Sequence, residues 1–523
     1  MCKDHKELYY PYMKKIFIIL FSSIGFVVTA QTPDEALRTA WFTQNGTARM
    51  MGAGGVMGSL GGDITANHIN PAGLGLYKTN ELVLSPGFLF NNNKFNYRSK
   101  DTATNKSNFG YGTSGIILAG NINKRSKWTS SAFAISVNQL ANYNNDVQFS
   151  GRNNVSSFSE KYLEELIRDR ADTNAALNNY IFGSSLAFRT FLVDTIRGIG
   201  GAVAGYQSLV PISSGINQMY SAQTRGGYNE IAIGAARNMN DQLYVGGSLT
   251  IPIIRFSRDL FYSERDATTN TNNQFSSFEY KETYISNGTG IGAKMGLIYK
   301  PKEFIRLGFA LHTPQLMTFN DQIRSSMVTN TESYAGLQNE SSDALNSGNA
   351  GNSRYTLLTP YRIIGSASYV FREVNDTRLQ RGFISADLEF VNYRGARFSS
   401  ANENVGDITL QNYYQAINET IKETYRGNIN FKLGGELKFN TWMFRLGGAF
   451  YGSPYADNVL NANRIIGSGG LGYRNKGFFI DLTYSHIMNK DFQFPYLLND
   501  KPNTFATQTG NRGNAMLTFG IKI

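Results

Sequence analysis

The feature that most constrains the fold of this chain is a strict alternation of apolar and polar residues within short runs. Between Ile429 and Phe439 the odd positions are apolar or glycine, whereas the even positions are polar or glycine. The same period of two recurs in residues 478–485 and 514–523. Because a period of two places alternate side chains on opposite faces of a sheet, the sequence predicts an all-β protein.

Short turns and long connections alternate between fourteen runs of this kind, an even number as in single-chain bacterial barrels. The predicted strands are 81–90, 111–120, 130–140, 226–238, 242–254, 288–300, 303–313, 357–371, 380–393, 425–440, 441–452, 464–475, 477–490 and 511–523. The connections predicted to be long are 91–110, 141–225, 255–287, 314–356, 394–424, 453–463 and 491–510. An apolar outer face with short turns at one end predicts a 14-stranded antiparallel transmembrane β-barrel whose short turns face the periplasm. A soluble β-sandwich, the alternative, explains the one-sided loop lengths less well.

Residues 1–30 are predicted to be a signal peptide, with Met13 as the true start. Two lysines precede the apolar run Ile16–Val28, and small residues ending at Ala30 form a cleavage site. The run is too short to span a bilayer as a helix, although an N-terminal anchor is the alternative interpretation. The only cysteine, Cys2, lies in this segment, so a chain that begins at Gln31 offers no disulfide and no thiolate ligand.

Composition argues against several classes of function. The net charge of +11 comes from basic residues scattered along the chain, so no nucleic-acid partner is expected. The four histidines are too widely spaced to predict a metal site, and no cofactor motif appears. There is no G-x-S-x-G elbow, so we expect a protein without enzymatic activity.

About fifty residues, 31–80, precede the first predicted strand and are expected to form a plug, or hatch, for the barrel 81–523. Residues 51–63 are rich in glycine, but Met57 stands where the last glycine of a G-x-G-x-x-G phosphate loop belongs. The glycines instead predict a compact segment whose backbone packs closely inside the barrel.

Within this segment, Asp63 is followed by Asn70-Pro71-Ala72-Gly73-Leu74, and Gly46, Ala48, Arg49 and Gly52 precede it. These positions resemble the FadL family of outer-membrane transporters for long-chain fatty acids and other hydrophobic compounds, which includes the toluene-uptake TodX branch. Other stretches, at 306–314, 359–362, 387–393 and 451–455, resemble its Bacteroidetes-type members. The resemblance implies a location in the outer membrane and a periplasmic-side hatch at residues 31–80, with the Asn70-Pro71-Ala72 segment inside the lumen. We expect movement of the hatch to be centred on Asn70, Pro71, Ala72 and Gly73.

The resemblance also implies an inward kink in the third strand that opens the wall sideways. That strand contains no glycine or proline near residues 134–143, so the break is expected at Asn138 and Gln139. A fatty-acid carboxylate would need a cation. Four cations have inward parity, although a luminal Asp or Glu is an alternative partner for each: Lys294, Arg362, Lys432 and Arg445.

The insertion 141–225 carries helical spacing, with Leu163, Leu166 and Ile167 on one predicted face, and should form a helical cap on the extracellular mouth. The expected function is passive uptake of hydrophobic compounds, with long-chain fatty acids first, through a plugged barrel. The expected partners are a hydrophobic small molecule and the outer-membrane lipid or lipopolysaccharide, and the expected state is a monomer. Alternatives are a FadL-like accessory of surface-protein secretion that acts by protein interaction, an outer-membrane lipid enzyme and a general porin.

Overall fold

The computed structural model describes residues 32–121, 126–198, 200, 203–371, 381–401 and 408–523. The predicted signal peptide, residues 1–30, lies outside the described residues. Among those that are described, no helix is both long and apolar enough to cross a bilayer.

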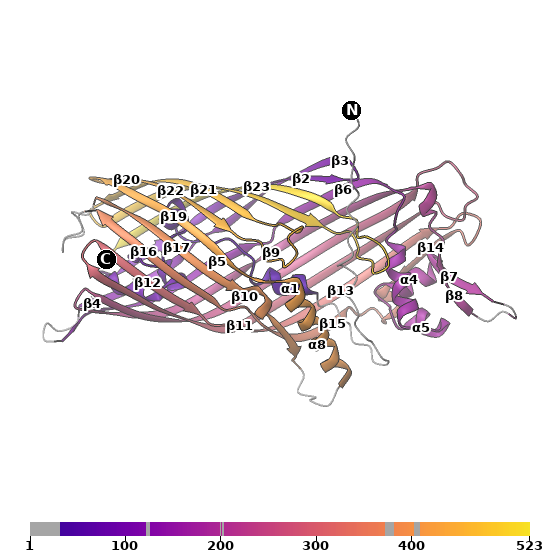
Figure 1. The fold of residues 1–523 in the computed structure, drawn as a ribbon, viewed down its shortest axis with the longest axis horizontal. Helices are drawn as coiled ribbons and strands as arrows, with labels where there is room; N and C mark the ends of the chain where they lie inside the picture. The colour runs from indigo at the N-terminus through magenta and orange to yellow at the C-terminus, as the bar shows by residue number, and fades with distance from the viewer. Residues whose placement is uncertain (1–31, 122–125, 199, 201–202, 372–380, 402–407) are drawn as a thin grey trace.

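The described chain is dominated by one closed antiparallel barrel with 14 wall strands (Figure 1). Several wall strands consist of two consecutive segments: β1 (Glu81–Leu84) with β2 (Pro86–Tyr97), β3 (Lys100–Tyr111) with β4 (Ser114–Asn121), β5 (Trp128–Asn142) with β6 (Asn145–Asn153), β12 (Ile305–His312) with β13 (Leu316–Asn330), β15 (Gly351–Leu358) with β16 (Arg362–Phe371), and β17 (Gly382–Asn392) with β18 (Arg397–Ser400). The others are β9 (Ile216–Met239), β10 (Leu243–Asp266), β11 (Ser277–Lys302), β19 (Gly427–Phe439), β20 (Trp442–Tyr451), β21 (Arg464–Asn475), β22 (Phe478–Gln493) and β23 (Ala506–Lys522). The first and last wall strands pair, as in Leu82 with Ile521, which closes the barrel. The predicted fold class is confirmed, and each predicted strand overlaps one wall strand.

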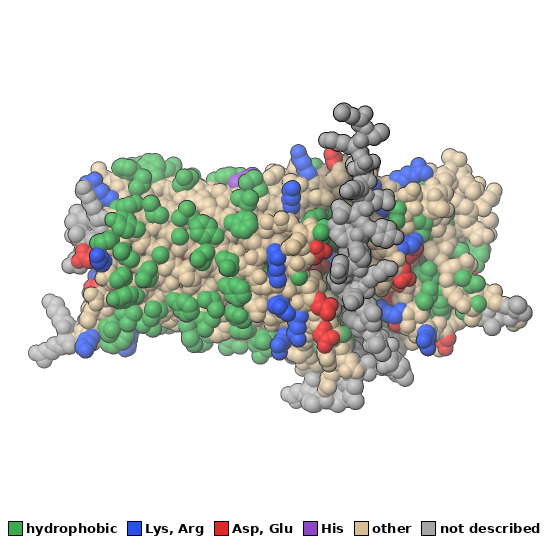
Figure 2. Space-filling view, in the orientation of Figure 1, with side chains coloured by type: hydrophobic (Ala, Val, Ile, Leu, Met, Phe, Trp, Pro, Cys, Tyr) green, Lys and Arg blue, Asp and Glu red, His purple; other side chains and the backbone are tan. Residues whose placement is uncertain are grey.

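The alternation in the sequence separates the outside of the wall from its lumen. On β20, Leu446 is 77% exposed, whereas the adjacent Arg445 is 4% exposed. Figure 2 shows apolar side chains covering the wall toward the end that carries the short turns. A lipid-facing apolar band over a polar interior is the property that places a closed barrel in a membrane.

The wall strands are much longer than the sequence predicts. β9 and β10 each have 24 residues and β11 has 26, whereas about 10 residues suffice to cross a bilayer. The prediction of a long loop at 91–110 was wrong, because β2 and β3 continue to a tight turn at Arg98 and Ser99. Beyond the membrane the outer face of a strand is wet, so the apolar alternation on which the prediction rests disappears.

The insertion 141–225 contributes β6 and then forms a compact cap at the end opposite the short turns (Figure 1). The residues with helical spacing, Leu163, Leu166 and Ile167, do fall within one helix, in which Leu166 is fully buried and Ile167 is 54% exposed. The elements of the cap are α4 (Ser159–Arg168), α5 (Thr173–Asn178), α6 (Ser184–Arg189), β7 (Val193–Arg197), β8 (Val203–Ser208) and η4 (Ile212–Ser214). Later extracellular elements are β14 (Leu337–Ser341), α7 (Ser342–Leu345), η6 (Tyr393–Gly395) and α8 (Ile408–Thr424).

Residues 32–80, here called the hatch segment, lie against the inner wall. Their elements are α1 (Pro33–Arg38), α2 (Ala48–Gly52), α3 (Ala66–Ile69) and η2 (Pro71–Leu76). Gly54 shows why the segment is rich in glycine. Its φ of +71° is a left-handed conformation, and a Cβ there would lie 2.6 Å from the backbone nitrogen of Gly448. Backbone therefore packs directly on backbone at this point.

Candidate functional site

The Asn70–Gly73 segment is fixed to the wall by the Asn70 side chain, which is fully buried. Its Nδ2 donates to the carbonyl of Gly58 at 2.5 Å and lies 3.2 Å from the carbonyl of Leu297 on β11. Its Oδ1 accepts from the backbone N–H of Ala72 at 3.2 Å and caps η2, with Pro71 in the first helical position. One amide side chain therefore holds the turn closed and attaches it to the barrel.

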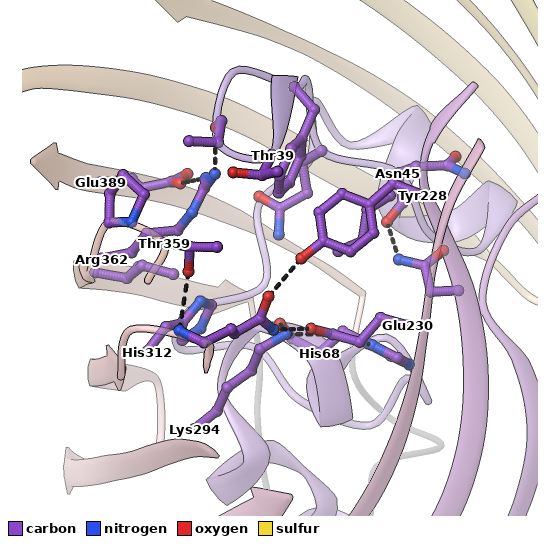
Figure 3. Close-up of a pocket in the computed structure, with 18 of the residues that line it drawn as sticks. Thr39, Asn45, His68, Tyr228, Glu230, Lys294, His312, Thr359, Arg362 and Glu389 are labelled. Carbon is purple, nitrogen blue, oxygen red and sulfur yellow. Dashed lines mark hydrogen bonds and ion pairs between the residues drawn. The ribbon is translucent and has the colours of Figure 1, made fainter. Parts of the chain in front are cut away.

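A buried polar network joins α3 to three wall strands (Figure 3). His68 Nδ1 lies 2.8 Å from Glu230 Oε1, and its Nε2 lies 2.9 Å from Ser136 Oγ. Lys294 completes the network by donating to Glu230 and to the carbonyl of His68. Burial lowers the pKa of His68, so the neutral ring can donate to Glu230 and accept from Ser136.

The Ser136–His68–Glu230 chain has the connectivity of a nucleophile, base and acid. Its surroundings do not fit that chemistry. Ser136 is 2% exposed, and its oxygen also accepts a hydrogen bond from Asn67 at 2.8 Å. We interpret the chain as a connection between hatch and wall, in which each polar group is satisfied.

Two further predicted cations converge on Glu389. Arg362 Nη1 lies 2.6 Å from one carboxylate oxygen, and Lys432 Nζ lies 2.6 Å from the other. Both also contact the hatch segment: Arg362 donates to the carbonyl of Ala40, and Lys432 donates to Gln44. These contacts attach the stretch that follows α1 to β16 and β19.

Arg445 lies apart from the other three candidates, behind α2. Its guanidinium lies 2.6 Å from Glu436 and 2.6 Å from Asp481. Arg49 of the hatch segment approaches the same Glu436 at 3.3 Å. All four predicted cations thus have a wall carboxylate as partner, and three of them also hold the hatch directly.

A small cavity of about 60 Å³ lies between the hatch segment and the wall (Figure 3). Lys294 and Arg362 line it together with Phe42, Leu140 and Tyr228, whereas Lys432 and Arg445 do not. Sites that enclose drug-sized ligands measure about 300–1,000 Å³, so this cavity is too small for a fatty acid. At this point the hatch segment leaves no space for such a solute.

The wall ladder is interrupted beside this cavity, between the second and third strands. The pairing of β4 with β5 stops at Ser114 and Val137, and among the described pairings β3 joins only β2. The β5 register against β9 shifts between Gln139 and Ala141, directly after the predicted break at Asn138 and Gln139.

Asn45 of the hatch segment spans this interruption. Its Nδ2 lies 2.8 Å from the carbonyl of Tyr111 on one side and 2.8 Å from that of Gln139 on the other. Asn138 returns a hydrogen bond to the Asn45 carbonyl at 2.9 Å. A residue of the hatch thus replaces part of the missing ladder.

Two luminal arginines were not among the predicted cations. Arg464 stacks on the Trp41 ring of the hatch segment at 4.2 Å, and the Nε of Arg512 is buried without a hydrogen-bond partner among the described residues. Both have inward parity, Arg464 as the first residue of β21 and Arg512 near the middle of β23, and this parity is the signal that could have identified them.

A closed barrel with an apolar outer band, a hatch inside and a cap at one mouth defines a plugged outer-membrane barrel. No family model and no curated protein matches the sequence. Among solved structures, the chain is similar to a FadL homologue from Pseudomonas aeruginosa, with 14% identity over 92% of this chain and 99% of that chain and a TM-score of 0.52. It is also similar to the Pseudomonas putida toluene transporter TodX (12% identity, 92% and 99% coverage, TM-score 0.49) and to the Ralstonia pickettii toluene transporter TbuX (15%, 92% and 98%, 0.47). The first similarity confirms the predicted resemblance at the level of the fold.

Proposed function

We propose that this protein takes up hydrophobic compounds passively across the outer membrane, and that long-chain fatty acids are the first class to test. The observation that carries the proposal is the position of Asn45. A hatch residue there closes an interruption in the wall, so one displacement of the hatch opens the lumen and the side of the barrel together.

The chemistry of an apolar solute favours this route. A water-filled pore offers nothing to a hydrocarbon chain, whereas an apolar pocket removes its surface from water at about 25 cal/mol per Å². Phe42, Leu140 and Tyr228 line the closed cavity and would border the enlarged one after the hatch moves. Movement centred on Asn70–Gly73 then releases the solute sideways or downward along its gradient.

The paired cations support a coupling between hatch position and carboxylate binding. Lys294, Arg362 and Lys432 each bond both a wall carboxylate and the hatch segment. When the hatch withdraws, each loses a partner and gains the capacity to bind a solute carboxylate. Arg464 and Arg512, nearer the extracellular mouth, would contact the carboxylate first.

The experiment that tests hatch movement is a reversible disulfide. Ser59 Oγ of the hatch segment lies 2.7 Å from Ser366 Oγ on β16, so Ser59→Cys with Ser366→Cys places two thiols within bonding reach. Oxidation should abolish uptake of a fluorescent long-chain fatty acid by cells, and reduction should restore it. Ser366→Cys alone is the matched control and should respond to neither treatment.

Undiminished uptake by the oxidised double variant would contradict the hatch mechanism. If that result came with a discrete protein partner and no bound apolar molecule, the secretion-accessory alternative would replace transport. Native mass spectrometry of the detergent-purified barrel distinguishes the two cases.

A further inference from the structure

Three outward side chains form a row on adjacent strands at the extracellular edge of the apolar band. Lys490 on β22 is opposite Thr509 on β23, which in turn is opposite Lys94 on β2. The Cα atoms of the two lysines are therefore two strand spacings apart, a distance of about 10 Å. All three residues are exposed, and neither lysine forms an ion pair with another described side chain. Figure 2 shows Lys and Arg side chains gathering along this edge.

The row lies where the wall changes from apolar to polar. On the membrane side, Met488 is 48% exposed two residues from Lys490, and Phe90 is 40% exposed four residues from Lys94. On the other side, Asn96 donates to Asp101 in the polar extension of the wall. The two ammonium groups therefore stand at the level of the lipid headgroups in the outer leaflet.

An apolar groove of about 1,180 Å³ lies on the outside of β19–β22, on the membrane side of this row. Four outward glycines leave its floor without side chains: Gly435, Gly448, Gly467 and Gly469. Leu433, Leu446 and Phe450 form its sides. A Cβ added at Gly467 would meet no heavy atom within 4 Å, so the space is open to an occupant.

The groove runs toward the row. Its lining includes His486 on β22, which is opposite Gly467 on β21. Lys490 is four residues further along the same strand, a rise of about 13 Å. A single molecule can therefore place an anionic head at the lysines and an apolar tail in the groove.

We propose that the row Lys94–Thr509–Lys490 and the adjoining groove bind one phosphorylated, acylated glycolipid of the lipid A type. Its phosphate accepts hydrogen bonds from the two ammonium groups and from the Thr509 hydroxyl. One acyl chain fills the glycine groove, where it gains dispersion contacts that a loosely packed lipid would lack. The site is on the outside of the wall, so the inference goes beyond transport and does not depend on it.

The test is a titration of the purified full-length protein in detergent with lipid A, read by native mass spectrometry. The wild type should bind one lipid A, and Lys94→Gln with Lys490→Gln should weaken that binding at least tenfold. Lys302→Gln with Lys476→Gln removes the same charge at the short turns and should bind as the wild type does. Equal binding by the Lys94/Lys490 variant and the wild type would overturn the proposal.

A second pair of variants tests the groove. Gly467→Leu with Gly469→Leu fills it and should weaken lipid A binding several-fold, whereas Gly365→Leu, at another open outward glycine, should not. If the wild type bound phosphatidylglycerol as tightly as lipid A, and the same variants weakened that binding, the assignment to lipid A would be overturned. If the wild type is a dimer and the Gly467/Gly469 variant is a monomer, the occupant of the groove would instead be a second copy of this chain.

Discussion

The Nδ2 of Asn45 lies 2.8 Å from the carbonyl oxygen of Gln139, and this hydrogen bond replaces a ladder contact that the wall lacks. The donor belongs to the hatch and the acceptor to the barrel. At this point, therefore, a displacement of the hatch segment would also break a hydrogen bond of the wall.

Asn45→Ala should loosen the wall between β3 and β5. The half-buried carbonyls of Tyr111 and Gln139 lose their donor, which costs at most about 1–3 kcal/mol each. Hydrogen exchange of residues 138–142 should become faster, and fatty-acid uptake should increase. Asn142→Ala is the control beside the same interruption. It removes a 3.3 Å contact to the Phe109 carbonyl and the two hydrogen bonds that Asn144 donates to Asn142 Oδ1, but it keeps both Asn45 contacts, so fatty-acid uptake should not increase.

The docking of α1 should depend on pH through Glu35. One hydroxyl, that of Tyr284, lies 2.5 Å from Glu35 and 2.6 Å from Asp321, and a single hydroxyl proton cannot serve both carboxylates. Burial, together with the charge of Asp321, raises the pKa of Glu35 to about 7 against the opposing effects of Arg38 and Arg258. When Glu35 is protonated, its own O–H can donate to the Tyr284 oxygen, and the Tyr284 proton is then free for Asp321.

A folded-state pKa above the unfolded value means that this stabilisation is fully present below about pH 4.5 and is lost as pH rises through about 7. The upper limit is about 3 kcal/mol. Trp41 fluorescence, recorded with the other two tryptophans replaced by Phe, should report undocking as pH rises. Glu35→Gln should abolish the transition, and a transition that persists in this variant would exclude Glu35 as its origin.

Gly54→Ala should displace the hatch more than Gly62→Ala does. Both glycines have positive φ, +71° and +63°, so both variants carry the left-handed penalty of about 1 kcal/mol. Only at Gly54 would the new methyl group meet wall backbone, 2.6 Å away, whereas Gly62 has open space. Protease sensitivity of residues 32–80 should increase in the first variant, and equal sensitivity in both would refute close backbone packing.

Lys294→Met should destabilise the closed hatch by about 3–5 kcal/mol, because Glu230 remains buried with one charge partner removed. Adding Glu230→Gln to that variant should recover most of the loss, since no uncompensated charge is left. Thermal unfolding of the hatch measures both. A double variant that is less stable than Lys294→Met would show that Glu230 stabilises the hatch mainly through His68 and Gln315.

The membrane-facing half of the fold follows from the sequence because lipid imposes a rule there. Leu433 must face hydrocarbon and Lys432 must not, so alternation identifies both strand and face. No such rule applies to Ser277–Asn287 of β11, whose outer face is wet, and the prediction of a loop there was wrong.

The candidate site was less predictable because its contacts join residues that are far apart in the sequence. Parity indicates that Lys294 and Arg362 point inward, but it cannot show that both also bond the hatch more than two hundred residues away. Asn45 carried no local signal at all, since its role depends on an interruption between two distant strands. Gating at Asn70–Gly73 stays a prediction that the disulfide experiment tests.

The length of the wall determines where a solute first meets the protein. β11 rises well above the apolar band, by about 40 Å if its 26 residues are tilted as barrel strands usually are. The mouth of the barrel therefore stands well above the lipid headgroups. Under the proposed function, a molecule arriving from outside would reach the cap before it reaches the membrane surface, so its capture would begin in the surrounding medium.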